Sequence, residues 1–249
     1  MDGIPMRGGS VRENPRIKKG ALLANQAYEA IKHELIYAEE PQGRELIGSH
    51  LAKRFGISRT PVHAALARLQ EDGLVETIPG KGTRVVPMDA GYIQEVFEVR
   101  FALECLAARK AAPFIDDQEL GKLQKEFDAL RGPLEQGDIP VSVQFEFRIH
   151  SLYIDKCGSR LLRNTLNRLQ DHQLRIRLFA IKDQENVLAS NKEHDQLLSA
   201  MFTKDPDTVE TAVRNHLSSA WLRVCKIVDC RFGEQIALAV TAREAPRGQ

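Results

Sequence analysis

Three histidines and one glutamate in the second half of the chain have the residue types and spacing of a metal site. His150, His194 and His216 each fall on the apolar stripe of a different expected helix, which would bury them. Glu146 precedes His150 by four residues, so the two side chains would share a helix face. One carboxylate and three imidazoles converging inside a helical domain would bind a divalent transition metal such as Zn²⁺, Ni²⁺ or Mn²⁺. Each histidine alone is as well explained as a hydrogen-bonded core residue.

The elements that would carry these residues are helices. After Asp89, which suits a helix N-cap, we expect a mainly α domain in which six helices form an antiparallel bundle. The expected helices cover residues 90–112, 116–135, 140–156, 159–181, 185–203 and 206–229. The histidines His33, His50 and His172 are expected at the surface.

The first part of the chain has a different pattern, centred on the stretch from Leu51 to Val86. A short helix, a turn at Gly56 and a second helix are followed by two β-prone segments joined through Pro-Gly-Lys-Gly. The order predicts a winged helix-turn-helix. With a helix over residues 22–38 before it, this unit would span residues 20–88, between a disordered arm at 1–19 and the bundle at 89–232; a flexible tail at 233–249 ends the chain.

The second helix of this unit has one apolar face and one polar end. Val62, Ala65, Leu66 and Leu69 share a face, and the first polar side chains point away from it. In helix-turn-helix proteins such residues reach base edges in the major groove. Two serines occupy expected N-cap positions, and the hairpin tip supplies a lysine between glycines. The candidate DNA-binding residues are Ser49, Ser58, Arg59, Thr60, His63, Lys81 and Gly82.

The length, composition and cysteine content of the chain exclude several classes of protein. The chain has 249 residues, of which 43% are hydrophobic, yet no apolar run approaches the roughly 20 residues that span a bilayer. The N-terminus has no apolar segment typical of a secretion signal. Four cysteines, without a Cys-x-x-Cys pair, fit a reducing compartment. We therefore expect a cytoplasmic protein with no membrane partner.

The run LAKRFGISRTPVHAALARLQEDGLVETIPGKGTRVV resembles the winged helix-turn-helix of the GntR family of bacterial transcription regulators. The resemblance implies that Arg59 and Thr60 contact an operator and that Lys81 enters a minor groove. One position departs from the family, which usually has arginine where this chain has His63. Histidine is shorter and mostly neutral at pH 7, so base preference or affinity there is expected to differ.

The second domain also resembles a known family. The segments EVRFALECLAARKAA, EFRIHSLYIDKCGSRLL, NKEHDQLLSAM and AVRNHLSSAW are similar, in order, to the FCD ligand-binding domain of FadR-type GntR regulators, and six helices are more like its VanR branch. The resemblance implies that Glu146, His150, His194 and His216 bind the metal, with Glu146 in place of the usual aspartate.

Two arginines are candidates for binding a small organic acid. Arg100 lies on the inward face of its helix, at the pocket-facing arginine of the resembled family. A buried arginine needs a carboxylate, which Glu104, one turn further on, or an effector would supply. Arg175 is a weaker candidate, as is Arg177.

The expected function is therefore a metabolite-responsive transcription regulator, a repressor rather than an enzyme. It would bind a palindromic double-stranded DNA operator as a homodimer, and an organic acid held near the metal would alter that binding. Two alternatives remain open at this stage. The chain could be a metal-dependent enzyme acting on a small carboxylate, or a DNA-binding regulator whose bundle only dimerises.

Overall fold

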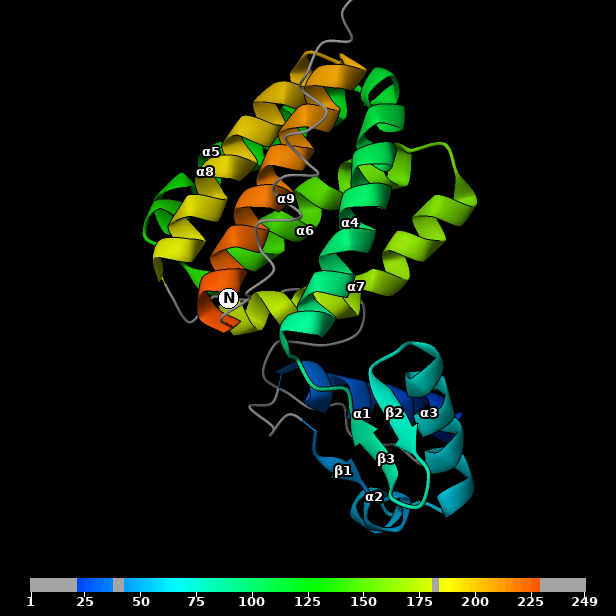
Figure 1. The fold of residues 1–249 in the computed structure, drawn as a ribbon. Coiled ribbons are helices and arrows are strands. Elements are labelled where there is room, and N and C mark those ends of the chain that lie inside the picture. Colours follow the sequence, from blue (N-terminus) through cyan, green and yellow to red (C-terminus); the bar gives the residue numbers. More distant parts are fainter. Residues whose placement is uncertain (1–21, 38–42, 181–183, 229–249) are drawn as a thin grey trace, which may run out of the picture. The chain divides into compact units, whose positions relative to one another are not determined.

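The computed structural model describes residues 22–37, 43–180 and 184–228, which form two compact units that divide between Met88 and Asp89 (Figure 1). The arm predicted at 1–19 and the tail predicted at 233–249 lie outside these ranges. The fold is mainly α with a small sheet in the first unit, which confirms the predicted fold class. Among the described helices, none is long and apolar enough to cross a membrane.

In its described residues, 22–37 and 43–88, the first unit contains three helices and a three-stranded sheet (Figure 1). Its antiparallel strands lie in the order β1-β3-β2. The elements are α1 (Leu23–Tyr37), β1 (Glu45–Leu46), α2 (Gly48–Phe55), α3 (Arg59–Glu71), β2 (Val75–Ile78) and β3 (Gly82–Val85). The hairpin of β2 and β3 is the predicted wing. The sequence did not reveal β1, because two residues are too short to show an alternating pattern.

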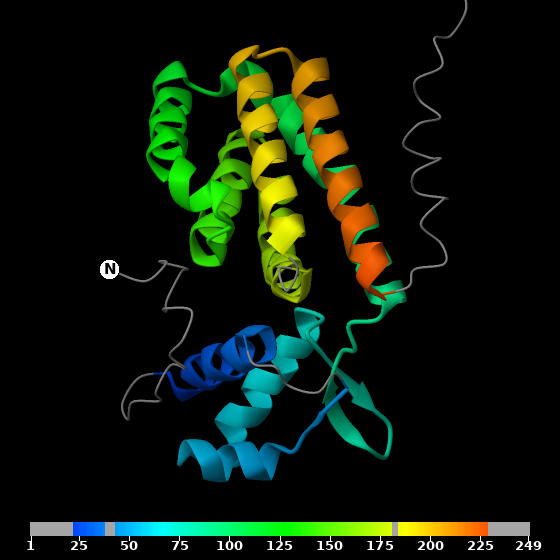
Figure 2. The same ribbon diagram turned by 90° about the vertical axis from the view of Figure 1, so that its left-hand side faces the viewer.

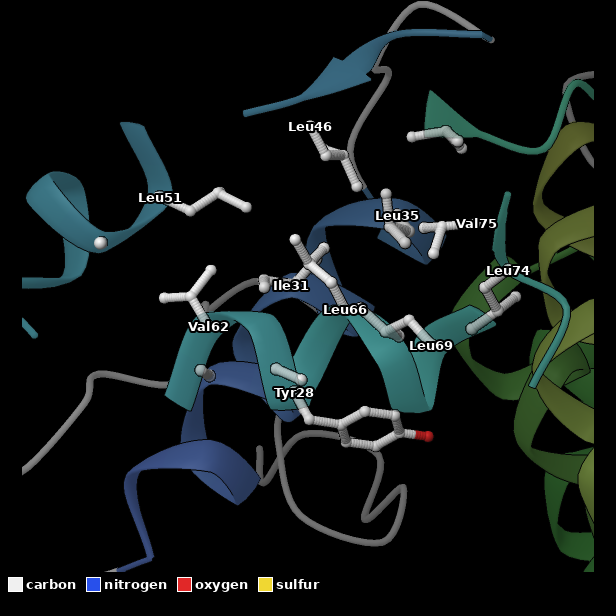
Figure 3. Close-up of a cluster of buried hydrophobic side chains, with 14 residues drawn as sticks. Tyr28, Ile31, Leu35, Leu46, Leu51, Val62, Leu66, Leu69, Leu74 and Val75 are labelled. Atoms are coloured by element: carbon white, nitrogen blue, oxygen red, sulfur yellow. The ribbon is translucent and has the colours of Figure 1, made fainter. Parts of the chain in front are cut away.

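A single apolar core holds this unit together (Figure 3). Leu69 and Leu74 are fully buried, and Ile31 of α1 packs into the same cluster as Leu51 of α2 and Val75 of β2. The predicted buried face of α3 is confirmed, since Val62, Ala65, Leu66 and Leu69 are all buried. The core therefore fixes which face of α3 remains outside.

Two turns of this unit require glycine, and one of the two N-caps predicted from the sequence was wrong. Gly56 ends α2 at φ 66°, and Gly73 follows α3 at φ 72°, both in the left-handed region that favours glycine. Ser49 is not an N-cap, because β1 pairs with β3 up to Leu46 and α2 already begins at Gly48, after Ile47. Ser58 does occupy the N-cap of α3, but its side chain makes no capping hydrogen bond.

The second unit is built from helices (Figures 1 and 2). They are α4 (Ala90–Ala111), a short 3₁₀ turn (Ala112–Phe114), α5 (Asp117–Glu135), α6 (Ile139–Lys156), α7 (Arg160–Ala180), α8 (Gln184–Phe202) and α9 (Pro206–Val228). Asp89, Asp116 and Asp138 accept backbone hydrogen bonds as N-caps of α4, α5 and α6. Helices α4 and α9 lie side by side, α8 packs on α9, and α6 contacts both α4 and α8. The space between these four helices is where the buried histidines lie.

Candidate metal centre and candidate nucleic-acid interface

The exposed side of α3 carries the residues that the sequence singled out for DNA. Arg59, Thr60 and His63 are exposed at its N-terminal end, opposite the buried face. Ser58 precedes them and is also exposed, whereas Ser49 in the first turn of α2 is half-buried. A helix held by an apolar core with a polar N-terminal end facing outward has the geometry of a recognition helix.

The wing offers a second set of backbone and side-chain groups. Lys81 and Gly82 are exposed at the tip of the β2–β3 hairpin, and Gly80 and Gly82 have φ angles of 76° and 93°. The glycines bring the backbone to the surface without side-chain bulk, and the lysine provides a positive charge for phosphate.

His63 is less free than its exposure suggests. A methyl group built on Gly48, the first residue of α2, would lie 3.2 Å from Cε1 of the His63 ring. The ring therefore rests against the start of α2. The missing side chain at Gly48 makes room for this histidine, a contact that the sequence pattern alone could not show.

The three histidines of the second unit come together as the sequence predicted. His150 of α6, His194 of α8 and His216 of α9 are buried, and one ring nitrogen from each lies within 4.8 Å of the others. Nε2 of His150 and Nε2 of His216 are 3.2 Å apart. Three buried imidazoles at this separation have the donor set of a Zn²⁺ or Ni²⁺ site with further positions open.

Two glutamates lie within hydrogen-bond distance of the second ring nitrogen, Nδ1, of His150 and His216. Nδ1 of His150 lies 2.8 Å from Oε2 of Glu104, and Nδ1 of His216 lies 2.9 Å from Oε2 of Glu193. Burial alone would raise the pKa of Glu104, but Arg100 and then His150 hold it well below its ordinary value. The pKa of Glu193 is likewise lowered against the effect of burial, by His216 and Arg223. Both carboxyls are therefore ionised acceptors.

His194 has the opposite environment. It is fully buried, and neither ring nitrogen has a hydrogen-bond partner among the residues that the structure describes. Burial lowers its pKa well below 6.5, and the charges of His216 and His150 add to this shift. Burial also lowers the pKa of His216, although the hydrogen bond that His216 donates to Glu193 opposes this shift. These two imidazoles are neutral at pH 7, the form that binds a metal.

Glu146 lies near the histidines but is engaged elsewhere. Its Oε2 is 2.8 Å from Nε of Arg177, and it does not belong to the compact set of ligand atoms formed by the three histidines. Burial would raise its pKa, but Arg177, followed by His150 and His216, lowers it. Its role as a fourth metal ligand stays a prediction.

A pocket of about 470 Å³, counting the space open to solvent, adjoins the histidines. Arg100 lines it as predicted, and Nε of this arginine is 2.7 Å from Oε1 of Glu104, the intrachain partner considered from the sequence. The other polar residues lining the pocket are Glu146, Gln173, Arg177, Asn186, His216 and Arg223. Sequence reasoning missed Arg223 because its partner Glu193 lies on another helix, so no local spacing relates the two.

Arg175 is placed away from the pocket lining. Its guanidinium lies 5.5 Å from the ring centre of Tyr92, whose hydroxyl is 2.7 Å from Nδ1 of His172. His172 is buried, so the prediction that it lies at the surface was wrong. The ring faces α4 because α7 packs on α4 with the side of the helix that carries His172. A single polar residue in an amphipathic pattern does not show which side of the helix will be buried.

A winged helix-turn-helix joined to a helical domain with a buried polar site is typical of DNA-binding regulators with a separate C-terminal domain. Comparison with known proteins identifies the family. Residues 23–85 match the bacterial regulatory proteins of the gntR family, and residues 95–219 match the FCD domain. The chain belongs to the GntR family of bacterial transcription regulators and has the FadR-type architecture with an FCD domain.

Individual relatives agree with this assignment. The chain is 24% identical over 192 residues to the HTH-type transcriptional repressor RspR of Escherichia coli, covering 77% of this chain and 84% of that protein. It is 34% identical to an HTH-type regulator in the TAR-I ttuE-ttuC' intergenic region of Agrobacterium vitis, over 51% of this chain and 77% of the other. The structure of E. coli McbR/YncC has the same fold, with a TM-score of 0.65, 22% identity and coverage of 82% and 98%. These relatives are transcription regulators and not enzymes.

Proposed function

We propose that this regulator is a metal-binding repressor that responds to a small organic acid. The observation that carries the proposal is the cluster of His150, His194 and His216 beside a pocket lined by arginines. The protein would act in the cytoplasm, on DNA, as a homodimer. The repressor assignment is supported by the names of relatives such as RspR.

A divalent transition metal fits the residues present. His194 is buried, and neither of its nitrogens has a partner among the described residues; such a group is costly unless something binds it. A purely structural polar core would satisfy its members, so this residue favours a ligand site over the structural alternative. His150, His194 and His216 would hold the ion, Zn²⁺, Ni²⁺ or Mn²⁺, with Glu146 as the candidate fourth ligand.

An anionic effector fits the charges around the pocket. Three arginines line it, and each pairs with one glutamate: Arg100 with Glu104, Arg177 with Glu146 and Arg223 with Glu193. These charges cancel, so a divalent cation would leave the site positive. Together with the forked guanidinium groups, this charge favours a carboxylate. Arg100 is the predicted effector ligand, and Arg177 and Arg223 are better placed than Arg175.

The two units would be coupled through differential binding. An effector can alter DNA affinity only if it binds the DNA-competent and DNA-incompetent states with different affinity. In a homodimer, each subunit would place α3 in one major groove of a palindromic operator, so a change in the spacing of the two helices would change affinity. Arg59 and Thr60 would contact bases or phosphates, and Lys81 would contact the backbone.

Gel-shift titration with DNA from the region upstream of the protein's own gene tests the DNA-binding part directly. The proposal predicts binding at low salt that an excess of unrelated DNA does not remove, and its loss in Arg59→Ala. Metal analysis of protein purified without a histidine tag tests the second part. Binding no better than to unrelated DNA, or metal content equally low in the wild type and in His194→Ala, would refute the respective part.

A further inference from the structure

Two of the three imidazoles stand at the end of a chain of charged contacts that begins at the pocket. On one side, Arg100 Nε lies 2.7 Å from Glu104 Oε1, and Glu104 Oε2 lies 2.8 Å from His150 Nδ1. On the other side, Arg223 contacts both oxygens of Glu193, with Nη2 2.9 Å from Oε2, and Glu193 Oε2 lies 2.9 Å from His216 Nδ1. His194 has no such partner in the described part of the chain.

The chemistry of imidazole gives these contacts a direction. A neutral imidazole has one N–H, and an ionised carboxylate can only accept a hydrogen bond. With Glu104 and Glu193 at the Nδ1 atoms, the proton of each ring is held at Nδ1 and the Nε2 lone pair is free. Those two Nε2 atoms are the ones that face each other at 3.2 Å. The carboxylates therefore present the nitrogens that a shared ion requires.

Tyr153 is a second group at Nδ1 of His150, and a hydroxyl that donated to this nitrogen would reverse the arrangement. Its hydroxyl lies 2.5 Å from Glu104 Oε2 and 2.6 Å from His150 Nδ1. The carboxylate is the stronger acceptor, so the hydroxyl donates to Glu104. Nδ1 of His150 then keeps its own proton and also donates to Glu104. Tyr153 thus supports the same tautomer.

The arginines fix the carboxylates in turn. Glu104 is fully buried, and its other oxygen accepts from Arg100 and from Gln173 Nε2 at 3.1 Å. The fork of Arg223 grips both oxygens of Glu193, which leaves this carboxylate one orientation toward His216. Both arginines also line the pocket, so the groups that would bind an anion hold the partners of two metal ligands.

We propose that Glu104 and Glu193 are positioning residues for the metal, and that Arg100 and Arg223 anchor them. Each carboxylate fixes the tautomer and the orientation of one imidazole, so that His150 and His216 bind through Nε2. His194, for which residues 22–37, 43–180 and 184–228 offer no such partner, is oriented by the side chains packed around it. The inference rests on the proposed metal site. It adds four residues that support the site without binding the metal themselves.

Glu193→Gln is the primary test, because this side chain is partly exposed and its loss leaves Arg223 able to reach solvent. The amide is the same size but weakens the hold on the Nδ1 proton. We expect Zn²⁺ affinity, measured by competition with a chromophoric chelator, to fall by roughly 10- to 100-fold, as for other partners of ligating histidines. Arg223→Gln should also lower the Zn²⁺ affinity, but by a smaller factor. Glu98→Gln on α4, an exposed glutamate outside the site, is the matched control and should bind as the wild type does.

Two readouts separate positioning from a general loss of structure. The thermal unfolding midpoint of metal-free Glu193→Gln should stay close to that of the wild type, and Glu193→Asp should recover part of the affinity. The visible absorption of the Co²⁺-loaded protein should change in Glu193→Gln, since it reports the ligand geometry. Glu104→Gln is a secondary arm, because it leaves Arg100 buried without a counter-charge.

The outcomes are distinguishable. Wild-type affinity and an unchanged Co²⁺ spectrum in Glu193→Gln would overturn the inference while leaving the metal site intact. A loss of affinity that follows an equal loss of metal-free stability would assign Glu193 a structural role and also overturn it. A wild-type protein that binds no Zn²⁺ would refute the proposed metal site itself.

Discussion

The DNA-binding unit carries its candidate functional groups on its surface, whereas the helical unit buries them. Arg59, Thr60 and Lys81 lie on the surface of elements that a local core holds in place. The imidazoles of His150 and His216 are buried, and their partners come from other helices. One short stretch of sequence can supply all the residues of a surface that contacts DNA. A site that must hold an ion without competing water needs several distant segments.

This difference explains which predictions succeeded. The helix, the turn at Gly56 and the wing follow from residue spacing within about thirty positions, since each depends on local backbone preferences. The convergence of the three histidines was also predictable, because each lies on an apolar stripe that must face the interior. The fold class and the family assignment were confirmed in the same way.

The partners of the histidines could not be predicted from spacing. Glu193 and His216 are 23 residues apart on different helices, and Glu104 and His150 are 46 residues apart. Only the packing of α4 on α6 and of α8 on α9 brings them together. For the same reason Glu146, which shares a helix face with His150, was expected as a ligand, whereas the structure pairs it with Arg177.

The largest expected effect is the loss of the metal in His194→Ala. Removing a direct ligand should cost more than the roughly 10- to 100-fold expected for an outer partner. DNA binding by the metal-free wild type and by the variant should then be alike. Isothermal titration with Zn²⁺ measures the first quantity. Unchanged Zn²⁺ affinity in the variant would break the assignment of the helical unit as the metal-binding one.

A core substitution tests whether the two units are separate in energy. Leu69→Ala removes a fully buried side chain of the DNA-binding unit and should cost about 2–5 kcal/mol. The single tryptophan, Trp221, lies in α9 and reports only the helical unit. The urea transition seen by circular dichroism should gain an early phase, while the Trp221 fluorescence transition stays in place. An equal shift in both signals would contradict the separation.

On the DNA-binding side, Arg59→Ala should weaken specific binding by about 1–3 kcal/mol, the value of a bidentate contact to guanine. Binding to unrelated DNA should change much less. Fluorescence anisotropy with operator and scrambled duplexes measures both. A matched substitution, Arg160→Ala at the start of α7, should leave both unchanged. Equal losses on the two duplexes would reduce Arg59 to a phosphate contact.

Acid should destabilise the metal-free helical unit before it affects the carboxylates. Burial lowers the folded-state pKa of His194 well below 6.5, and that of His216 is also lowered. The unfolded chain therefore takes up protons first, so stability is full above pH 6.5 and falls as the pH drops below it. The Trp221 unfolding midpoint, followed from about pH 7.5 to about pH 5, should decrease. His194→Gln should show a smaller decrease; an identical decrease would contradict the assigned shift.

The smallest expected effect is at the wing. Lys81→Ala removes one positive charge from an exposed tip and should reduce the slope of log affinity against log salt by about 1. Affinity for operator and unrelated DNA should fall together. Anisotropy titrations at several salt concentrations give the slope. An unchanged slope would show that Lys81 makes no phosphate contact.

The central claim is that the buried site of the helical unit controls the DNA-binding unit. The most direct test is the affinity of the Zn²⁺-loaded protein for its operator, with and without an organic acid that raises its unfolding midpoint. The account predicts that this acid changes the dissociation constant by about 5- to 150-fold, the usual range of coupling between two sites, and that His194→Ala abolishes the change. An acid that stabilises the wild type through the histidine site, yet leaves the operator affinity unchanged, would contradict the claim.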